Sequence, residues 1–399
     1  MGGGGHPGDG AAMTTTAPTE AYRVRDGLPL PGPLAQLEGH AQRTDRYPIH
    51  ITRSPGETLD RLRPLVEGRS IGIVTDDVVH ALFAPRLLDA LRGFGEEVLV
   101  YAAPPGERSK SLDQAVCIWN WLAAGPLARR DVIIALGGGV IADLGGWVAS
   151  AYMRGIPYVN LPTTLLAQVD GALGGKVAVN HPVAKNLLGA FHQPAAVISD
   201  VSCLRSLERR HVAAGLAECI KKAMIASPDY WRLIRRDAPS ILDREPGALE
   251  RVVRGASAIK SALIARDPYE IDLRRPLNFG HTIGHPLETV TGYAPLLHGE
   301  AVAFGMVAES RVAAARGLLA PATLDALVDL LRDCGLPTHG TELPVPVPAS
   351  AVIAAMEKVR LIRAGSLRYV LPTDVGETVI ADDVIAAETR AALAACGLR

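Results

Sequence analysis

Three histidines and two glutamates lie close together in the stretch between His281 and Glu300. His281 and His285 are four residues apart, so on a helix their imidazoles face the same side. Neutral imidazole nitrogens suit zinc or a similar borderline cation. A third ligand is required, and the spacing does not choose among His298, Glu288, Glu300 and the distant Glu218. The alternative is that such histidines cap a helix end or form a hydrogen bond in the core.

A glycine turn upstream offers a place for the phosphates of a nucleotide. Gly137, Gly138 and Gly139 directly follow the β-rich run 131–136 and precede a helical segment. In that context glycines let backbone amides approach a pyrophosphate at a helix N-terminus. The spacing is not GxGxxG, and three glycines can also simply form a tight turn. Asp76 follows another strand-like run, where a carboxylate can accept hydrogen bonds from ribose hydroxyls; an aspartate in a surface turn is the alternative.

Cations gather in a third group of residues. Lys176 and Lys185-Asn186 are nine residues apart, and Lys221, Lys260 and Arg274 follow later in the chain. Lysine is a mobile point charge and arginine a fork for planar anions, so together they suit a substrate with phosphate and carboxylate groups. Solvated surface lysines are the alternative. This holds especially for Lys260, which the apolar stripe of 249–266 leaves on the polar flank of its helix.

Length and composition bound the class of protein. At 399 residues the chain fits two domains with a ligand cleft between them. A net charge of -1 gives no indication of a nucleic-acid or membrane surface. The five scattered cysteines lack CxxC spacing, which favours a reducing, cytoplasmic location over disulfides or a thiolate metal site.

The sequence gives no indication of a signal peptide or of a membrane span. Residues 1–44 are expected to be a disordered N-terminal extension, since they have neither the basic nor the apolar region of a signal peptide. No apolar run approaches the roughly 18 residues that a membrane span requires.

The order of elements predicts an α/β fold. Short apolar runs without period-two alternation indicate strands buried on both faces of a parallel sheet, at 70–75, 97–101, 131–136, 158–161 and 196–199. Helix-length segments at 82–93 and 111–124 lie between them. Residues 45–200 are therefore expected to form a Rossmann-like parallel-sheet domain that binds the nucleotide. Residues 201–399 are expected to form a mostly α-helical domain for metal and substrate, with a late strand or hairpin at 366–372.

Taken together, these segments resemble the 3-dehydroquinate synthase family of sugar phosphate cyclases from about Tyr47 to Pro372. The similarity is carried by the following segments: PPGERSKSL (104–112), ALGGGVIADLGG (135–146), the long run 152–194, GLAECIK (215–221), IKSALIARDPYE (259–270), LRRPLNFGHTIGH (273–285) and LHGEAVAFGM (297–306).

The resemblance implies a role for each residue at a matching position. It implies zinc, or cobalt in its place, held by Glu218, His281 and His298. It implies NAD bound by Asp76, Glu107, Lys110, Gly138, Gly139, Val140, Asp143, Thr163 and Thr164. The catalytic residues would be Lys176, Lys221, Lys260, Arg274, Asn278 and His285, and the substrate would also contact Asp170, Lys185 and Asn186. Arg154 would reach a phosphate in the neighbouring subunit of a homodimer.

The resemblance also implies the reaction. Transient oxidation of a substrate alcohol by NAD acidifies the adjacent C–H, phosphate leaves, hydride returns, and an intramolecular aldol step closes the ring. Lys260 and Arg274 match positions that bind a carboxylate, and Asn278 and His285 also match the dehydroquinate type. These residues favour 3-deoxy-D-arabino-heptulosonate 7-phosphate as substrate and 3-dehydroquinate as product.

One departure favours a different substrate. Where the family usually has Asp-Lys-Lys, this chain has Lys358-Val-Arg360, so a phosphate-binding lysine is lost or replaced by Arg360. The alternative is a paralogue of specialised metabolism that acts on an amino-substituted sugar phosphate or on carboxylate-free sedoheptulose 7-phosphate. Two other classes are a metal- and NAD-dependent alcohol dehydrogenase, and a non-catalytic binding relative.

Overall fold

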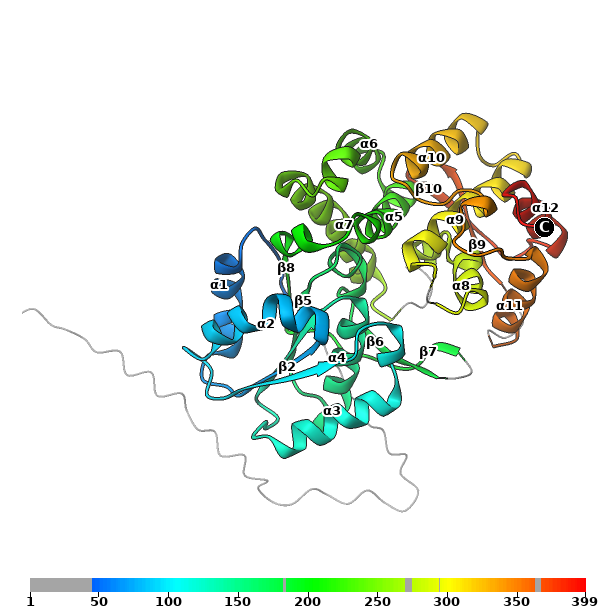
Figure 1. Cartoon of the computed structure of the whole chain (residues 1–399). Helices are drawn as coiled ribbons and strands as arrows, with labels where there is room; N and C mark the ends of the chain where they lie inside the picture. The colour runs from blue at the N-terminus through cyan, green and yellow to red at the C-terminus, as the bar shows by residue number, and fades with distance from the viewer. Residues whose placement is uncertain (1–44, 182–183, 270–274, 294, 363–366) are drawn as a thin grey trace, which may run out of the picture. The chain divides into compact units, whose positions relative to one another are not determined.

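A six-stranded parallel sheet forms the first half of the protein (Figure 1). The computed structural model describes residues 45–181, 184–269, 275–293, 295–362 and 367–399, so the predicted disordered extension 1–44 and Arg274 lie outside the described residues. The strand order is β1 (Ile49–Thr52), β8 (Ala196–Asp200), β5 (Tyr158–Pro162), β4 (Val132–Gly137), β2 (Ile71–Asp76) and β3 (Val98–Ala103). All neighbouring strands pair in parallel, with Ile71 opposite both Val98 and Val132.

The strands are apolar throughout because helices cover both faces of the sheet. Ile71, Ile73 and Ile134 pack with α1 (Pro55–Val66) and α2 (Asp77–Leu91). Val74 and Ile133 pack with α3 (Leu112–Ala124) and α4 (Gly139–Ala151) on the opposite face. Neighbouring strand residues point to opposite faces, so both must be hydrophobic. The predicted α/β fold and its five strands are therefore confirmed.

The strand order reverses between β2 and β4. From β2 the chain moves outward to β3, whereas from β4 it moves to β5 on the other side. Such a reversal leaves a crevice at the carboxyl ends of the two strands, where α/β proteins bind their ligands. Asp76 ends β2 and Gly137 ends β4, so the sheet brings the two nucleotide-site candidates to the same edge.

A hairpin extends from the sheet region and carries several predicted site residues. It consists of β6 (Lys176–His181) and β7 (Ala184–Phe191), paired antiparallel, with an irregular register near the turn. Asn186 in β7 has a positive φ of 56°. The sequence pattern did not predict this hairpin or the edge strand β1.

The second half is mostly helical, as predicted. It contains α5 (Arg209–Ala226), α6 (Pro228–Leu242), α7 (Pro246–Arg266), α8 (His281–Val290), α9 (His298–Ala315), α10 (Pro321–Asp333), α11 (Ala349–Ile362) and α12 (Ala386–Ala395). The antiparallel pair β9 (Tyr369–Asp374) and β10 (Glu377–Ala381) confirms the predicted late hairpin. The division into domains at residue 200 stays a prediction.

Two glycines let α9 lie against its neighbours at backbone distance. A Cβ on Gly299 would come within 1.9 Å of the carbonyl oxygen of Ala214 in α5, and one on Gly305 within 1.9 Å of the oxygen of Gly280. Any side chain would push these elements apart. Glycine at both positions therefore sets the spacing of α5, α8 and α9.

Two further observations concern the protein's surroundings. Among the described helices, none has the length and apolar character needed to cross a membrane. All five cysteines are free, as their spacing predicts, and the predicted cytoplasmic location stays a prediction.

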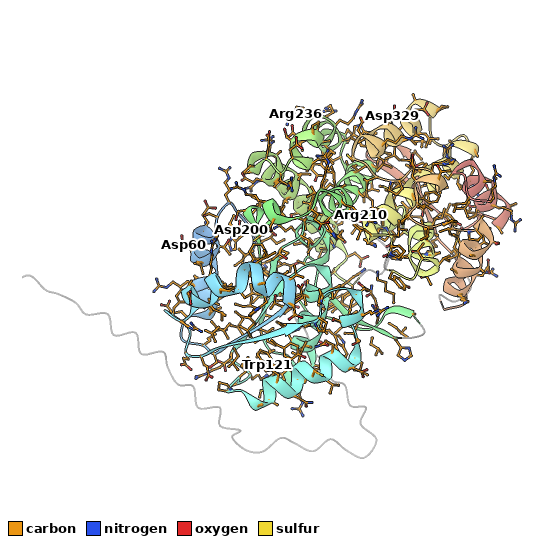
Figure 2. All side chains as sticks on the ribbon, viewed as in Figure 1. Asp60, Trp121, Asp200, Arg210, Arg236 and Asp329 are labelled. Carbon is orange, nitrogen blue, oxygen red and sulfur yellow. The ribbon has the colours of Figure 1, made fainter. Side chains whose placement is uncertain are left out.

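Trp121 of α3, labelled in Figure 2, packs against Tyr101 with ring centroids 5.5 Å apart.

Candidate metal and nucleotide site

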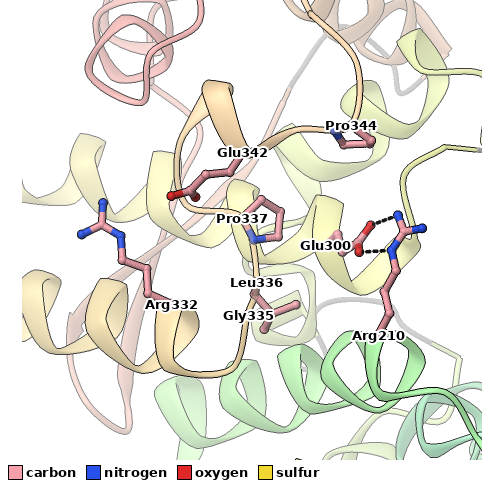
Figure 3. Close-up of a pocket in the computed structure, with 8 residues that line it drawn as sticks. All are labelled: Arg210, Glu300, Arg332, Gly335, Leu336, Pro337, Glu342 and Pro344. Atoms are coloured by element: carbon pink, nitrogen blue, oxygen red, sulfur yellow. Dashed lines mark hydrogen bonds and ion pairs between the residues drawn. The ribbon is translucent and has the colours of Figure 1, made fainter.

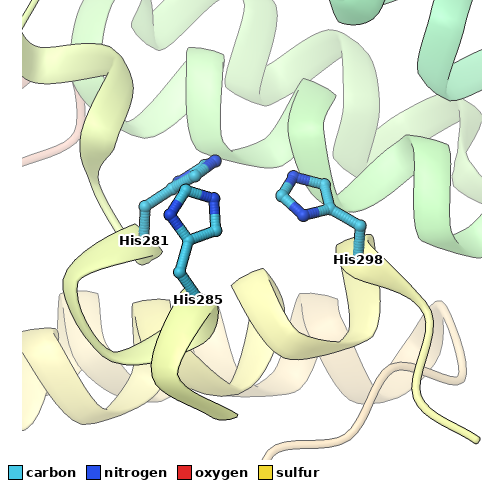
Figure 4. A group of neighbouring side chains, drawn as sticks. All are labelled: His281, His285 and His298. Atoms are coloured by element: carbon cyan, nitrogen blue, oxygen red, sulfur yellow. The ribbon is translucent and has the colours of Figure 1, made fainter. Parts of the chain in front are cut away.

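Three imidazoles converge at the adjoining ends of α8 and α9. His281 is the first residue of α8, His285 lies one turn later, and His298 is the first residue of α9. Figure 4 shows the three rings facing one another, and one nitrogen from each lies within 4.8 Å of the others. The predicted histidine cluster therefore forms in the folded chain.

Glu218 of α5 lies close to two of these imidazoles. Its Oε1 lies 3.6 Å from Nε2 of His281 and 3.7 Å from Nε2 of His298. This oxygen is fully buried and has no hydrogen-bond partner among the described residues. An orphaned carboxylate oxygen between two imidazole nitrogens is costly unless a cation binds there. The donor set, two nitrogens and one oxygen, is one that zinc accepts.

Lysines fix the orientation of Glu218. Its other oxygen, Oε2, lies 2.5 Å from Nζ of Lys221 and 3.3 Å from Nζ of Lys222. Burial would raise the pKa of Glu218, but these ammonium groups and the histidines hold that pKa well below its usual value. The carboxylate is therefore ionised and directs one free oxygen at the imidazoles.

The two imidazoles nearest to Glu218, those of His281 and His298, are each oriented by a hydrogen bond at Nδ1. Nδ1 of His281 lies 3.0 Å from the carbonyl oxygen of Phe279, and Nδ1 of His298 lies 3.1 Å from Oε2 of Glu288. Both acceptors require Nδ1 to carry the proton, so Nε2 faces Glu218 as a potential ligand atom. Burial, together with Lys221, lowers the pKa of His281 well below its usual value. Burial also opposes a charge on His298, but Glu288 and Glu218 raise its pKa to about 9.

A buried glutamate fastens the start of α8. Glu309 of α9 is fully buried and accepts hydrogen bonds from the amides of Gly280, at 2.8 Å, and Ile283, at 3.3 Å. It satisfies amides at a helix N-terminus that Gly280, at φ 78°, has no side chain to cap. Burial raises the pKa of Glu309 to about 8. This cap sets the position of His281.

Three buried lysines and two carboxylates form a charge cluster beside the imidazoles. Asp170 receives Nζ of Lys222 at 2.7 Å and Nζ of Lys260 at 3.0 Å, and its backbone oxygen lies 2.7 Å from the same Lys260 atom. Lysine charges outnumber carboxylate charges, three to two, when Lys221 and Glu218 are included. The excess positive charge suits an anionic substrate.

Two lysines in this cluster differ from expectation. The alternative that Lys260 is a solvated lysine on the polar flank of its helix does not hold, because α7 packs that face against the π-helical turn Ala167–Gly171 and leaves Lys260 only 6% exposed. Lys222 was missed by sequence reasoning, although it is fully buried and bound to both Asp170 and Glu218. The available signal was a second lysine next to Lys221 in the otherwise apolar run 219–226 of α5.

The glycine turn lies open at the switch point of the sheet. Gly138 precedes α4 as its N-cap, and a Cβ placed on Gly139 would meet nothing within 4 Å. The hydroxyl oxygen of Thr163, directly after β5, is buried and has no partner among the described residues. An open helix N-terminus beside an unsatisfied hydroxyl fits the phosphates of a dinucleotide. Thr164 lies next to Gly138, and Val140 follows in the first turn of α4.

Asp76 has a structural role at this edge. Its Oδ1 accepts hydrogen bonds from the amides of Val78, at 3.0 Å, and Val79, at 2.9 Å, and so caps α2. The cap explains why α2 begins at Asp77, earlier than the predicted residue 82. A role in binding a ribose stays a prediction.

Polar contacts join the nucleotide side to the hairpin. Nζ of the buried Lys110 contacts both Asp143 of α4 and the side-chain oxygen of Asn186 in β7. Glu107 accepts a hydrogen bond from Asn180 at 2.7 Å and lies 3.8 Å from Nζ of Lys185. The structure thus brings together five predicted residues from three separate segments.

The remaining predicted residues differ in their surroundings. Lys176 begins β6 and is exposed, and Asn278 ends the 3-10 turn before α8. Arg154 is exposed, with φ 64°, and follows Met153, whose φ is 49°. Arg360 is half-exposed on α11 and pairs with Glu357 at 2.8 Å.

The two alternative carboxylate ligands point elsewhere. Glu288 binds Nδ1 of His298, as described above, and Glu300 forms a two-point ion pair with Arg210 at 2.6 and 2.8 Å. That pair lies in an open pocket of about 640 Å³ (Figure 3), lined by Arg210, Glu300, Arg332, Gly335, Leu336, Pro337, Glu342 and Pro344. None of the three histidines lines this pocket.

Comparison with known proteins identifies related chains. The family model described as 3-dehydroquinate synthase N-terminal matches residues 100–214, and the model described as 3-dehydroquinate synthase C-terminal matches residues 215–359. The chain is 53% identical to 2-epi-valiolone synthase of Actinosynnema mirum over 93% of this chain and 97% of that protein. It is 40% identical to 3-dehydroquinate synthase of Desulforamulus reducens over 87% of this chain and 96% of that protein.

A solved structure shares the arrangement. The 2-epi-5-epi-valiolone synthase from Streptomyces hygroscopicus subsp. jinggangensis, solved with NAD+ and Zn2+ bound, superimposes with a TM-score of 0.83 at 30% identity. The match covers 90% of this chain and 99% of that structure. The similarity therefore extends through both the sheet and the helical half.

Substitution of the histidines tests the metal site. We expect His281→Ala and His298→Ala each to weaken zinc binding by at least about 100-fold, because each removes a nitrogen that faces Glu218. His285→Ala should weaken it by less than about tenfold. Zinc affinity is measured by competition with a chromophoric chelator, with His211→Ala, an exposed histidine of α5, as the control. An equal loss in His285→Ala would show that His285 is also a ligand.

Proposed function

The chain belongs to the 3-dehydroquinate synthase family of sugar phosphate cyclases, and on that premise we propose that it closes a seven-carbon sugar phosphate into a carbocycle with loss of phosphate. One observation carries the proposal. The free oxygen of Glu218 faces two imidazoles directly beside a buried cluster of three lysines, so a metal and a phosphorylated substrate fit one place.

Sedoheptulose 7-phosphate is the proposed substrate, with a valiolone-type cyclitol as product. The relative at 53% identity is a 2-epi-valiolone synthase, whereas the 3-dehydroquinate synthase of Desulforamulus reducens is 40% identical. The departure at Lys358-Val-Arg360 agrees with this choice, because Arg360 is half-exposed and paired with Glu357 in this structure. The comparisons therefore favour the carboxylate-free alternative over 3-deoxy-D-arabino-heptulosonate 7-phosphate.

Glu218, His281 and His298 would hold the zinc, or cobalt in its place. Zinc, when bound, polarises a substrate oxygen as a Lewis acid. Lys221 and Lys222 keep Glu218 ionised and turned toward the imidazoles. His285, whose ring centroid lies 4.8 Å from that of His281, would contact the substrate beside the metal.

Two further sets of residues complete the proposed site. NAD would be held at the switch point by Asp76, Glu107, Lys110, Gly138, Gly139, Val140, Asp143, Thr163 and Thr164. NAD, when bound, supplies reversible hydride transfer without net redox change. The substrate would contact Asp170, Lys176, Lys185, Asn186, Lys221, Lys260 and Asn278, with Arg274 and Arg360 as further predicted contacts. Lys221, paired with Glu218, and Lys260, paired with Asp170, are already oriented before an anion arrives.

Phosphate release from two sugars tests the substrate. With NAD and zinc supplied, we expect phosphate release from sedoheptulose 7-phosphate, without accumulation of NADH, at a kcat/KM at least about 100-fold above that for 3-deoxy-D-arabino-heptulosonate 7-phosphate. The opposite preference would indicate a 3-dehydroquinate synthase. Stoichiometric NADH would indicate an alcohol dehydrogenase, and no turnover of either sugar would contradict the proposal.

Lys260 gives the reaction an alkaline limit. Burial, only partly offset by Asp170, lowers the pKa of Lys260 to about 8. Below that pH the ammonium is charged and attracts the anionic substrate; above it the charge is lost. We expect kcat/KM to fall by up to about tenfold per pH unit above pH 8. Lys260→Arg keeps the positive charge and should abolish the fall in kcat/KM above pH 8. An unchanged fall in this variant would assign it to another titrating group.

We also propose that the protein acts as a homodimer in which Arg154 completes the partner's site. Support comes from two successive non-glycine residues in the left-handed region, Met153 and Arg154, on an exposed turn, since such strain is retained where it serves a function. Co-expressing Arg154→Ala with Lys221→Met should restore about a quarter of wild-type activity, because half of the dimers contain one intact site. No recovery in co-purified heterodimers would place Arg154 in its own subunit's site.

A further inference from the structure

Glu288 is a buried carboxylate that contacts both sides of the candidate site. It is 3% exposed and lies on α8, one turn after His285. Its Oε2 lies 3.1 Å from Nδ1 of His298, and its Oε1 lies 3.1 Å from Nζ of Lys185 in the hairpin. Each oxygen of this side chain therefore has a different partner.

The contact with His298 determines which nitrogen of the imidazole is free. An ionised carboxylate only accepts hydrogen bonds, so Nδ1 must donate. Nε2, which lies 3.7 Å from Oε1 of Glu218, is then the nitrogen at which a cation can bind in place of a proton. Glu288 does not reach the metal position itself, because its Oε2 is used at the far side of the ring.

Lys185 holds the other end of Glu288 from a different part of the chain. Its ammonium lies 3.8 Å from Glu107, on the nucleotide side, and 5.0 Å above the ring of Tyr293. Its side chain is 22% exposed, so the ion pair with Glu288 is largely shielded from water. A shielded ion pair fixes both partners more firmly than a surface pair does.

We propose that Glu288 is a positioning residue that ties the metal ligand His298 to Lys185, so that metal affinity depends on a lysine outside the metal's own ligand set. The inference rests on the metal site of the proposed function and deepens it. Lys185 keeps Oε1 occupied and thereby directs Oε2 at His298. The hairpin β6–β7 thus contributes to metal binding without supplying a ligand.

A glutamine at position 288 separates this role from simple packing. Glutamine has nearly the same shape but only one acceptor oxygen, and its amide nitrogen donates. Lys185 and Nδ1 of His298 would compete for that oxygen, and the charged lysine makes the stronger bond. His298 would then face the amide nitrogen, and its proton would move to Nε2, where it blocks the metal. Removing the charge of Lys185 should return the oxygen to His298.

The experiment measures zinc affinity of the full chain by chelator competition, without sugar or dinucleotide. We expect Glu288→Gln to weaken binding by about 10- to 100-fold and Lys185→Met by a few-fold. The double variant should bind zinc at least about threefold more tightly than Glu288→Gln alone. Without the ammonium of Lys185, Nδ1 of His298 is the one remaining donor of the two that compete for the amide oxygen. Glu250→Gln is the control, since Glu250 also accepts from two cations, Arg53 and Arg254, on the far surface of α7. It should leave zinc affinity unchanged.

Three results would overturn the inference. They are unchanged affinity in Glu288→Gln, a double variant no tighter than Glu288→Gln, and a wild-type chain that takes up no zinc. Should Glu288→Gln not fold, Lys185→Met decides alone, and unchanged affinity in that variant overturns the tie. Phosphate release by the wild type is scored separately, so a protein that shows the predicted zinc affinities but turns over neither sugar contradicts the proposed function and leaves the inference standing.

Discussion

The ion pairs between Glu218 and its two neighbouring lysines are the interaction on which the site depends. Burying a carboxylate is unfavourable unless cations compensate for the lost hydration, and Lys221 and Lys222 do so from the same helix. They bind one oxygen and leave the other free. That free oxygen gives the two imidazoles a common target, and the rest of the helical half holds three helices at the spacing that this requires.

The packing of α9 shows how the fold meets that requirement. Gly299 and Gly305 bring its backbone directly against α5 and the start of α8, and Glu309 of the same helix caps α8. One helix therefore carries His298, sets the distance to Glu218 and fixes His281. These three tasks explain why α9 contains a buried acid, Glu309, and two glycines, Gly299 and Gly305, in addition to His298.

The site combines two kinds of position. The switch point of the parallel sheet provides an open helix N-terminus, which any α/β fold of this topology offers to a phosphate. The histidines and lysines come from helices and from a hairpin, which supply the specific chemistry. Lys185 and Glu107 are in contact range where these parts adjoin, and Glu288 connects them to the metal ligands.

The sequence by itself determined five of the six strands of the parallel sheet, the helical second half, the histidine cluster and the family, because apolar runs and motifs are local properties of the chain. Residue spacing left open which carboxylate joins the histidines and whether Lys260 is solvated, although the family resemblance implied Glu218 and a substrate contact for Lys260. Lys222 was overlooked. Only the tertiary structure decided these points, since Glu218 is 63 residues from His281 and burial depends on which helix packs on which. The hairpin β6–β7 and the role of Glu288 were likewise decided by contacts between distant segments, which no periodicity records.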